Sequence, residues 1–259
     1  SISFENSDCI AVSKMKRKKS ILFLDNDLKY SQKNNIVQTL ENQVKHLANH
    51  IIVPQISKEK FCNHFKNKDI LTYNGYKEDI YLADFTSDPK FKEKIPYERF
   101  IVIRPEALGS FYVEKNLSII PELFSLFEKN NTNIIYLPRE KNEAIFAKNH
   151  DVFIPKSPLN GLDLSYYADA VLTGSGTMAR EAARMGKKAV SFFPNTQFLS
   201  VDKQLIQEKK IFHSRDPNEI CEYIITNPNK FNQIDFTQSK KVKNEVLTIL
   251  DTILKNMDL

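Results

Sequence analysis

The residues with the clearest chemical meaning lie between Ala168 and Pro194, where an apolar strand runs into a glycine-bearing turn and then a helix. The turn reads Gly174-Ser175-Gly176-Thr177, and its two glycines allow a tight bend with the backbone close to a ligand. The first N–H groups of a helix lack partners within it, and the helix dipole is positive at that end. Both effects converge at Gly176 to Met178, so this segment is predicted to hold an anionic group.

The same turn has a plainer interpretation, in which Ser175 or Thr177 only caps the helix and Glu181 is an ordinary acid of the first turns. Short glycine motifs are weak signals by themselves. Two features favour a binding site: Arg180 and Glu181 lie within a turn of the expected anion, and ligands of doubly wound sheets bind at the carboxyl ends of strands. The residues expected at this anion site are Gly174, Ser175, Gly176, Thr177, Arg180 and Glu181.

A second group of polar residues follows the buried strand that ends at Ile103. Arg104 suits bidentate contact with a phosphate or a carboxylate. Glu106 is a candidate acid, base or hydroxyl binder. The equally weighted alternative is an internal ion pair between Arg104 and Glu106 that shapes the loop, and the location of the pocket decides between the two.

A third strand, Ser20 to Leu24, also ends in carboxylates, those of Asp25 and Asp27. These two groups can share a proton or hold a substrate hydroxyl. The more common role for such a residue is to cap the helix that follows. Together with Glu106, Asp25 and Asp27 are the candidate catalytic residues.

Other chemistries lack their sequence motifs. Gly174-Ser175-Gly176 is not the Gly-x-Ser-x-Gly elbow of serine hydrolases, and no Gly-Lys-Ser/Thr of a Walker loop occurs. The 5 histidines lack helical or paired spacing with acidic residues, so no metal site is expected. Cys9, Cys62 and Cys221 are far apart, which fits a reducing cytoplasm.

Short apolar runs alternate with helical stretches from Ile101 onward, which predicts an α/β fold with a doubly wound parallel sheet. The expected strands are Phe100 to Ile103, Asn133 to Leu137, Val152 to Ile154, Ala170 to Thr173 and Ala189 to Phe193. The expected helices are Ser118 to Glu128, Glu140 to Lys148, Leu162 to Ala168, Met178 to Met185, Pro217 to Ile225 and Ser239 to Met257.

Upstream, Ser20 to Leu24 and Ile51 to Pro54 are typical of buried strands, and they flank a polar helix from about Gln32 to Leu47. A connecting region is expected near Asn67 to Tyr76. A doubly wound domain needs on the order of 100 to 150 residues, so the first domain is expected to lack its front segment. This divides the chain into a partial first domain (1–70), a second domain (71–235) and a C-terminal docking helix (236–259).

Composition indicates a globular protein. Of the 259 residues, 41% are hydrophobic and 27% charged, and no apolar run approaches the about 20 residues that cross a bilayer. The net charge is +5, with the densest basic run at Lys14 to Lys19. A solvated helix end explains this run more simply than nucleic-acid binding does, because no aromatic residues interleave with the basic ones. The run can still face a phosphate.

Several segments in order resemble those of a known family. They are Tyr73 to Glu78, Val102 to Ala107, Gly174 to Ala183, Ser191 to Pro194 and Val201 to Lys203. In combination they resemble the domain-of-unknown-function family 354, which is related to UDP-N-acetylglucosamine 2-epimerases and other GT-B glycosyltransferases. The resemblance covers about Ser20 to His213. It implies a GT-B-like fold, in which two Rossmann-like domains face each other across a cleft and the C-terminal one holds a nucleotide diphosphate.

By position, the resemblance places Ser175 to Thr177 and Glu181 at the nucleotide, and Arg104 with Glu106 at the cleft, faced by Asp25 and Asp27. It implies an enzyme with a UDP-sugar as substrate and no bound cofactor or metal, which performs glycosyl transfer or 2-epimerisation on an unknown acceptor or sugar. A homodimer is compatible with it. The alternative is a non-catalytic module that binds a nucleotide or a protein, which the expected loss of the front segment supports.

Overall fold

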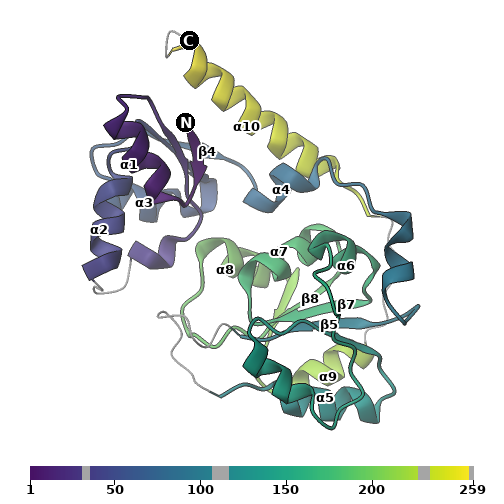
Figure 1. The fold of residues 1–259 in the computed structure, drawn as a ribbon. Helices are drawn as coiled ribbons and strands as arrows, with labels where there is room; N and C mark the ends of the chain where they lie inside the picture. The colour runs from purple at the N-terminus through teal and green to yellow at the C-terminus, as the bar shows by residue number, and fades with distance from the viewer. Residues whose placement is uncertain (31–35, 107–116, 227–233, 257–259) are drawn as a thin grey trace. The chain divides into compact units, whose positions relative to one another are not determined.

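The structure of this chain, a computed structural model, describes residues 1–30, 36–106, 117–226 and 234–256. The chain divides into two units, which are drawn in Figure 1. Unit 1 comprises Ser1–Ala83, Gln197–Gln204 and Thr237–Leu259, and unit 2 comprises Asp84–Thr196 and Leu205–Phe236. Three segments predicted from the sequence begin or end at a residue outside the described ranges: Gln32, Ala107 and Met257.

Unit 1 contains a parallel sheet of four strands in the order β1-β2-β3-β4. The strands are β1 (Ile2–Phe4), β2 (Ile21–Phe23), β3 (His50–Pro54) and β4 (Ile70–Tyr73). Its helices are α1 (Ser7–Met15), α2 (Ile36–Lys45), α3 (Lys58–His64), α4 (Lys77–Leu82) and α10 (Thr237–Lys255), with 3₁₀ turns η1 (Asp27–Tyr30) and η2 (Gln55–Ser57). Helix α8 (Ser200–Gln207) begins in this unit.

Helices cover both faces of this sheet because successive strand residues point to opposite sides. Leu22 and Ile51 pack with Ile10 of α1 and Phe61 of α3 on one face. On the other face, Ile21 and Phe23 pack with Val242, Val246 and Ile253, which recur at helical spacing along α10. Among the described residues, no helix combines the length and the apolar character that a membrane span requires.

The structure corrects the expected connection near Asn67 to Tyr76. Four of those residues form β4, which pairs with β3, so this stretch belongs to the first sheet. Tyr73 at its end is 2% exposed and packs into the α10 face of the sheet. The boundary expected after residue 70 therefore falls inside unit 1, because backbone pairing and the Tyr73 contact hold β4 there.

Unit 2 contains a parallel sheet of five strands in the order β6-β5-β7-β8-β9. The strands are β5 (Ile101–Arg104), β6 (Ile134–Tyr136), β7 (Ala170–Thr173), β8 (Lys188–Ser191) and β9 (Ile211–His213). The helices are α5 (Ile120–Lys129), α6 (Gly161–Tyr167), α7 (Gly176–Arg184) and α9 (Pro217–Thr226), with 3₁₀ turns η3 (Pro89–Lys94) and η4 (Lys141–Ala147). Figure 1 shows α5 and α9 on one face and α6 and α7 on the other, so the predicted α/β fold class is confirmed.

Two predicted elements of unit 2 take another form. Val152 to Ile154 supplies only one isolated bridge, between Ile135 and Phe153, and forms no strand of the sheet. Glu140 to Lys148 is a 3₁₀ helix over Lys141–Ala147. β2 and β6 are apolar strands of the same length, so the length of the run does not explain the difference; at Val152 to Ile154 only Phe153 pairs with the sheet.

The order of the unit 2 strands determines where a ligand can bind. Strand β5 lies between β6 and β7, so the chain passes from β5 to β6 on one side and then crosses to β7 on the other side of β5. In open α/β sheets, ligands bind outside the carboxyl ends of strands at such a switch point. Arg104 and Thr173 are paired in register at this edge. The edge formed by the ends of β5 and β7 is therefore the expected binding edge.

Gly174 follows β7 and lies against the chain that leaves β5. A Cβ atom at position 174 would lie 2.5 Å from the Cα and 2.7 Å from the Cγ of Glu106. The Gly174 N–H donates to the carbonyl oxygen of Arg104 at 3.1 Å. This close approach of two backbone segments requires glycine.

Gly174→Ala is expected to destabilise unit 2 by about 1–3 kcal/mol, because the added methyl group overlaps backbone atoms that cannot move aside cheaply. Urea unfolding followed by circular dichroism measures the change. The matched control is Gly161→Ala, since a Cβ at Gly161 would meet nothing within 4 Å. Equal unfolding midpoints for the two variants would show that the contact is not tight.

Candidate functional site

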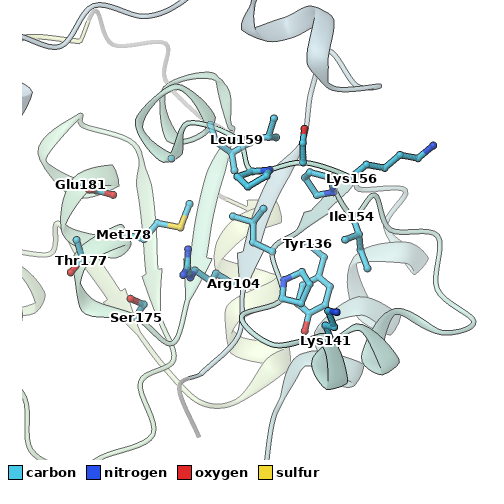
Figure 2. A pocket seen from close by; sticks show the side chains of 17 residues that line it. Arg104, Tyr136, Lys141, Ile154, Lys156, Leu159, Ser175, Thr177, Met178 and Glu181 are labelled. Atoms are coloured by element: carbon cyan, nitrogen blue, oxygen red, sulfur yellow. The ribbon is translucent and has the colours of Figure 1, made fainter. Parts of the chain in front are cut away.

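A cavity of about 920 Å³ lies in unit 2 at the carboxyl ends of β5 and β7. Its lining combines the predicted Arg104, Ser175, Thr177 and Glu181 with residues from the segments after β6 and before α6. Figure 2 shows Arg104 in the middle of this lining, with Ser175, Thr177 and Glu181 to one side. The structure thus brings together four of the predicted binding residues.

Arg104 is the last residue of β5 and is half-buried. Its Nε atom is buried without a hydrogen-bond partner, and across the described ranges no carboxylate forms an ion pair with its guanidinium. The nearby Glu106 pairs with another arginine, Arg215, so the alternative prediction of an internal Arg104–Glu106 ion pair is wrong. A guanidinium that faces a cavity and forms no ion pair attracts an anion.

Helix α7 begins at this cavity without a side-chain cap. Ser175 is its N-cap residue, with extended backbone at φ −118 and ψ 127, and its side chain makes no capping hydrogen bond. The Thr173 hydroxyl instead accepts the Ser175 N–H at 2.9 Å. The alternative in which Ser175 only caps the helix is therefore wrong, and the positive end of α7 remains directed at the cavity.

The remaining residues of the predicted anion turn, Gly174, Gly176 and Arg180, lie outside the lining of the cavity. Arg180 is 2% exposed and donates from Nη2 to the Thr177 hydroxyl at 3.4 Å. Gly174 holds the turn against Glu106, as its close approach requires. Direct contact of these three residues with a ligand stays a prediction.

Among the lining residues that the sequence reasoning did not select, three have a charged or phenolic side chain: Tyr136, Lys141 and Lys156. Tyr136 ends β6, Lys141 begins η4, and Lys156 follows the bridge at Phe153. The rule that selected Arg104, a polar residue just beyond an apolar run, would also have found Lys156, which follows Ile154 and Pro155. It would not have singled out Lys141, because Arg139 and Glu140 come before it. In Figure 2 the Lys156 side chain extends away from Arg104, whereas Lys141 lies beside Tyr136.

Tyr136 contributes a neutral hydroxyl to the lining. Burial raises the pKa of Tyr136 far above its usual value, and the negative charges of Glu143 and Glu106 raise it further. The hydroxyl donates to the carbonyl oxygen of Glu143 at 3.2 Å. Tyr136 therefore remains protonated at any ordinary pH and gives the cavity a wall without charge.

Glu106 lies inside the protein and does not line the cavity. Its side chain is 0% exposed, and Oε1 lies 3.0 Å from Nη1 of Arg215. The Ser118 hydroxyl donates to Oε2 at 2.9 Å, and the Ile119 N–H donates to Oε1 at 3.4 Å. This geometry favours a structural role over the predicted role as acid or base, which stays a prediction.

Asp25 and Asp27 lie in unit 1 beyond the carboxyl end of β2, and each forms an ion pair with a different lysine. Asp25 Oδ2 is 2.7 Å from Lys77 Nζ, and Asp27 Oδ2 is 3.2 Å from Lys60 Nζ. Both oxygens of Asp27 accept the Ser200 N–H at 3.2 Å, at the start of α8. The two carboxylates therefore have separate cationic partners, and their geometry gives no support to a shared proton. Asp27 caps a helix distant in sequence, and not the one that follows it.

The loop that carries Asp25 is held by a buried charge network. Glu5 Oε1 accepts the N–H groups of Asp25 and Asn26 at 2.9 and 3.0 Å. Its other oxygen lies 3.1 Å from Nζ of Lys45, which is completely buried. Glu41 also pairs with Lys45 at 2.7 Å. The network fixes the end of β2 and thereby the place of Asp25.

An uncharacterized protein of Methanocaldococcus jannaschii is 29% identical over 196 residues, which cover 71% of this chain and 56% of that protein. The chain therefore spans little more than half the length of this relative.

Solved structures of nucleotide-sugar enzymes have a similar fold. The UDP-GlcNAc 2-epimerase of M. jannaschii matches with a TM-score of 0.66 and 15% identity over 96% of this chain and 76% of that one. Its complex with UDP-GlcNAc and UDP matches with a TM-score of 0.61 and 14% identity, over 93% and 71% of the two chains. Sucrose-phosphate synthase of Thermosynechococcus elongatus matches with a TM-score of 0.60 and 12% identity, over 99% of this chain and 72% of that one. At these identities the likeness shows the fold alone, which is GT-B-like.

The family to which the chain belongs is shown by its own sequence match. The model of the family described as "Protein of unknown function (DUF354)" matches residues 20–254. This range is most of the 259 residues and contains both sheets apart from β1. The chain is a member of the DUF354 family, and its fold is that of UDP-GlcNAc 2-epimerases and GT-B glycosyltransferases.

Proposed function

We propose that this chain binds a nucleotide sugar of the UDP-sugar class in the unit 2 cavity and acts on it by glycosyl transfer or 2-epimerisation. The observation that carries the proposal is Arg104, a half-buried cation without a described carboxylate partner, which faces the same cavity as the start of α7. A diphosphate placed there would meet the guanidinium and the first N–H groups of the helix together.

The charge and size of the cavity support the same ligand class. Lys141 and Lys156 join Arg104 in its lining, and among the lining residues Glu181 is the single acid. The volume of about 920 Å³ is in the range of sites that enclose cofactor-sized molecules. The M. jannaschii epimerase, whose fold is similar, was solved in complex with UDP-GlcNAc and UDP. A ligand with two phosphates and a polar nucleoside suits this lining.

In sugar transfer or 2-epimerisation, the protein must stabilise a diphosphate whose charge grows as its bond to the sugar breaks. Arg104 and the N–H groups at the start of α7 are positioned donors for such a charge. Glu181, beside them, is placed to accept hydrogen bonds from hydroxyl groups of the ribose. The acid and base of the reaction remain the predicted Asp25, Asp27 and Glu106.

One observation favours the second candidate, a non-catalytic nucleotide-binding module. Asp25, Asp27 and Glu106 are each engaged in ion pairs, and Glu106 is fully buried. Proton NMR of UDP-GlcNAc incubated with the protein separates the candidates. Appearance of a 2-epimer, or release of UDP, supports the enzyme, whereas tight binding with unchanged spectra supports the module.

Arg104→Met is expected to weaken UDP binding by about ten- to a hundredfold in calorimetric titration, because hydrogen bonds to charged groups contribute about 1.5–3 kcal/mol. The control is Arg99→Met, at the amino end of the same strand, whose side chain is 74% exposed. Lack of UDP binding by the unchanged protein would overturn the proposal. Equal affinities of both variants would remove Arg104 from the site.

Glu181→Ala is expected to change the affinities for UDP and for inorganic pyrophosphate differently. Loss of a carboxylate that accepts ribose hydroxyls weakens UDP by roughly tenfold, since each such hydrogen bond contributes about 1–1.5 kcal/mol. Inorganic pyrophosphate has no ribose, and removal of a nearby negative charge leaves its affinity unchanged or raises it. Competition titrations with both ligands measure the difference. A parallel loss for UDP and pyrophosphate would assign Glu181 a structural role.

A further inference from the structure

A second cavity, of about 460 Å³, lies in unit 1 at the amino ends of β1 and β2. Apolar side chains line one part of it, those of Ile2, Val12, Ile21 and Leu254. Basic residues 16–19 line the rest. These are members of the basic run at Lys14 to Lys19, which the nucleotide proposal does not use. Apolar side chains and positively charged side chains therefore lie next to each other at this cavity.

Large apolar side chains are exposed on α1 and β1, two of the elements that form this cavity. Met15 is 81% exposed and Val12 is 55% exposed, and a spacing of three residues puts both on one side of α1. Ile2, at the edge of the sheet, is 49% exposed. Exposed apolar groups that gather in one patch mark an interaction surface more often than scattered ones do.

The positive charges of the patch are not neutralised within the protein. All residues from Lys14 to Lys19 except the apolar Met15 are basic, and all are exposed. Within the described ranges, Lys14, Lys16, Arg17 and Lys18 have no carboxylate in ion-pair contact. A solvated helix end would explain the charge but not the exposed hydrocarbon beside it.

We propose that unit 1 docks on an anionic membrane surface through a patch formed by Ile2, Val12, Met15, Lys16, Arg17 and Lys18. The apolar side chains enter the headgroup region, and the basic ones contact lipid phosphates. Nucleic acid is disfavoured, because no aromatic residue interleaves with the basic run. A second copy of the chain is disfavoured as well, because a two-fold contact would place two basic runs against each other.

The place of the patch is compatible with binding at the opposite edge of the same sheet. Ile2 pairs in register with Ile21 at the amino end of β2, whereas Asp25 follows its carboxyl end. Ligands of α/β sheets bind at carboxyl ends. Docking through the patch thus leaves the Asp25 edge of unit 1 uncovered, and the proposal does not depend on the nucleotide.

Flotation of the whole chain with vesicles tests the proposal. The protein is expected to float with vesicles of phosphatidylcholine and phosphatidylglycerol, to remain behind with pure phosphatidylcholine, and to dissociate as salt rises. Lys16→Glu/Lys18→Glu should weaken binding at least about 25-fold, since each basic residue near such a surface contributes about fivefold. The matched control is Lys240→Glu/Lys241→Glu, an equal charge change at exposed positions of α10.

A second pair of variants tests the apolar part without a change of charge. Met15→Ser should reduce flotation several-fold, whereas Leu247→Ser, at a 46% exposed position of α10, should not. Absence of flotation with anionic vesicles, equal flotation with neutral ones, or equal losses in patch and control variants would each overturn the proposal. Self-association that the patch variants abolish would overturn it too and identify a second copy as the partner.

Discussion

The buried ion pair between Glu106 and Arg215 is the interaction on which the binding edge of unit 2 depends. A carboxylate that is 0% exposed is stable only with a charged partner and further hydrogen bonds, and Arg215 supplies the charge at 3.0 Å. Arg215 also donates to the carbonyl oxygens of Phe192 at 2.8 Å and Leu117 at 2.9 Å. One guanidinium thus joins the chain after β5, the approach to α5 and the end of β8. Arg104 extends into the cavity from a strand end that this pair holds in place.

The two sheets use charge differently at their carboxyl ends. In unit 1, Asp25 and Asp27 each meet a lysine, so the carboxylates there are balanced within the protein. In unit 2, the carboxylate of Glu106 is withdrawn into the interior, and Arg104 is left at the surface of the cavity. Because the Glu106 carboxylate is buried and paired with Arg215, it does not neutralise Arg104, and this edge has an excess of positive charge. The two edges therefore differ in charge: the carboxylates of the unit 1 edge are paired with lysines, whereas the unit 2 edge has a guanidinium without an ion pair among the described residues.

Long apolar runs and strand-end polar residues could be predicted from the sequence, and long-range partners could not. Strands such as β5 and β7 are continuous runs of buried residues, and Arg104 follows directly from their position. The strands that were missed, β1, β4 and β9, contain exposed or half-buried residues among the buried ones, so pairing with neighbours defines them more than composition does. Glu106 was assigned to chemistry because nothing local reveals Arg215, whose guanidinium arrives from a distant part of the chain.

Strand order also determines when the anion site can exist. Arg104 and α7 follow strands that are adjacent in the sheet but separated in the chain by β6, so no local segment holds these groups together. Pairings of this long-range kind form late relative to local helices, because the entropy of loop closure must be lost first. An anion that contacts both groups recognises only the folded unit, and it raises the free energy of unfolding by an amount that grows with the ratio of its concentration to its Kd. Such an anion would act as a structural element of unit 2, because it would link the end of β5 to the start of α7, which follows β7.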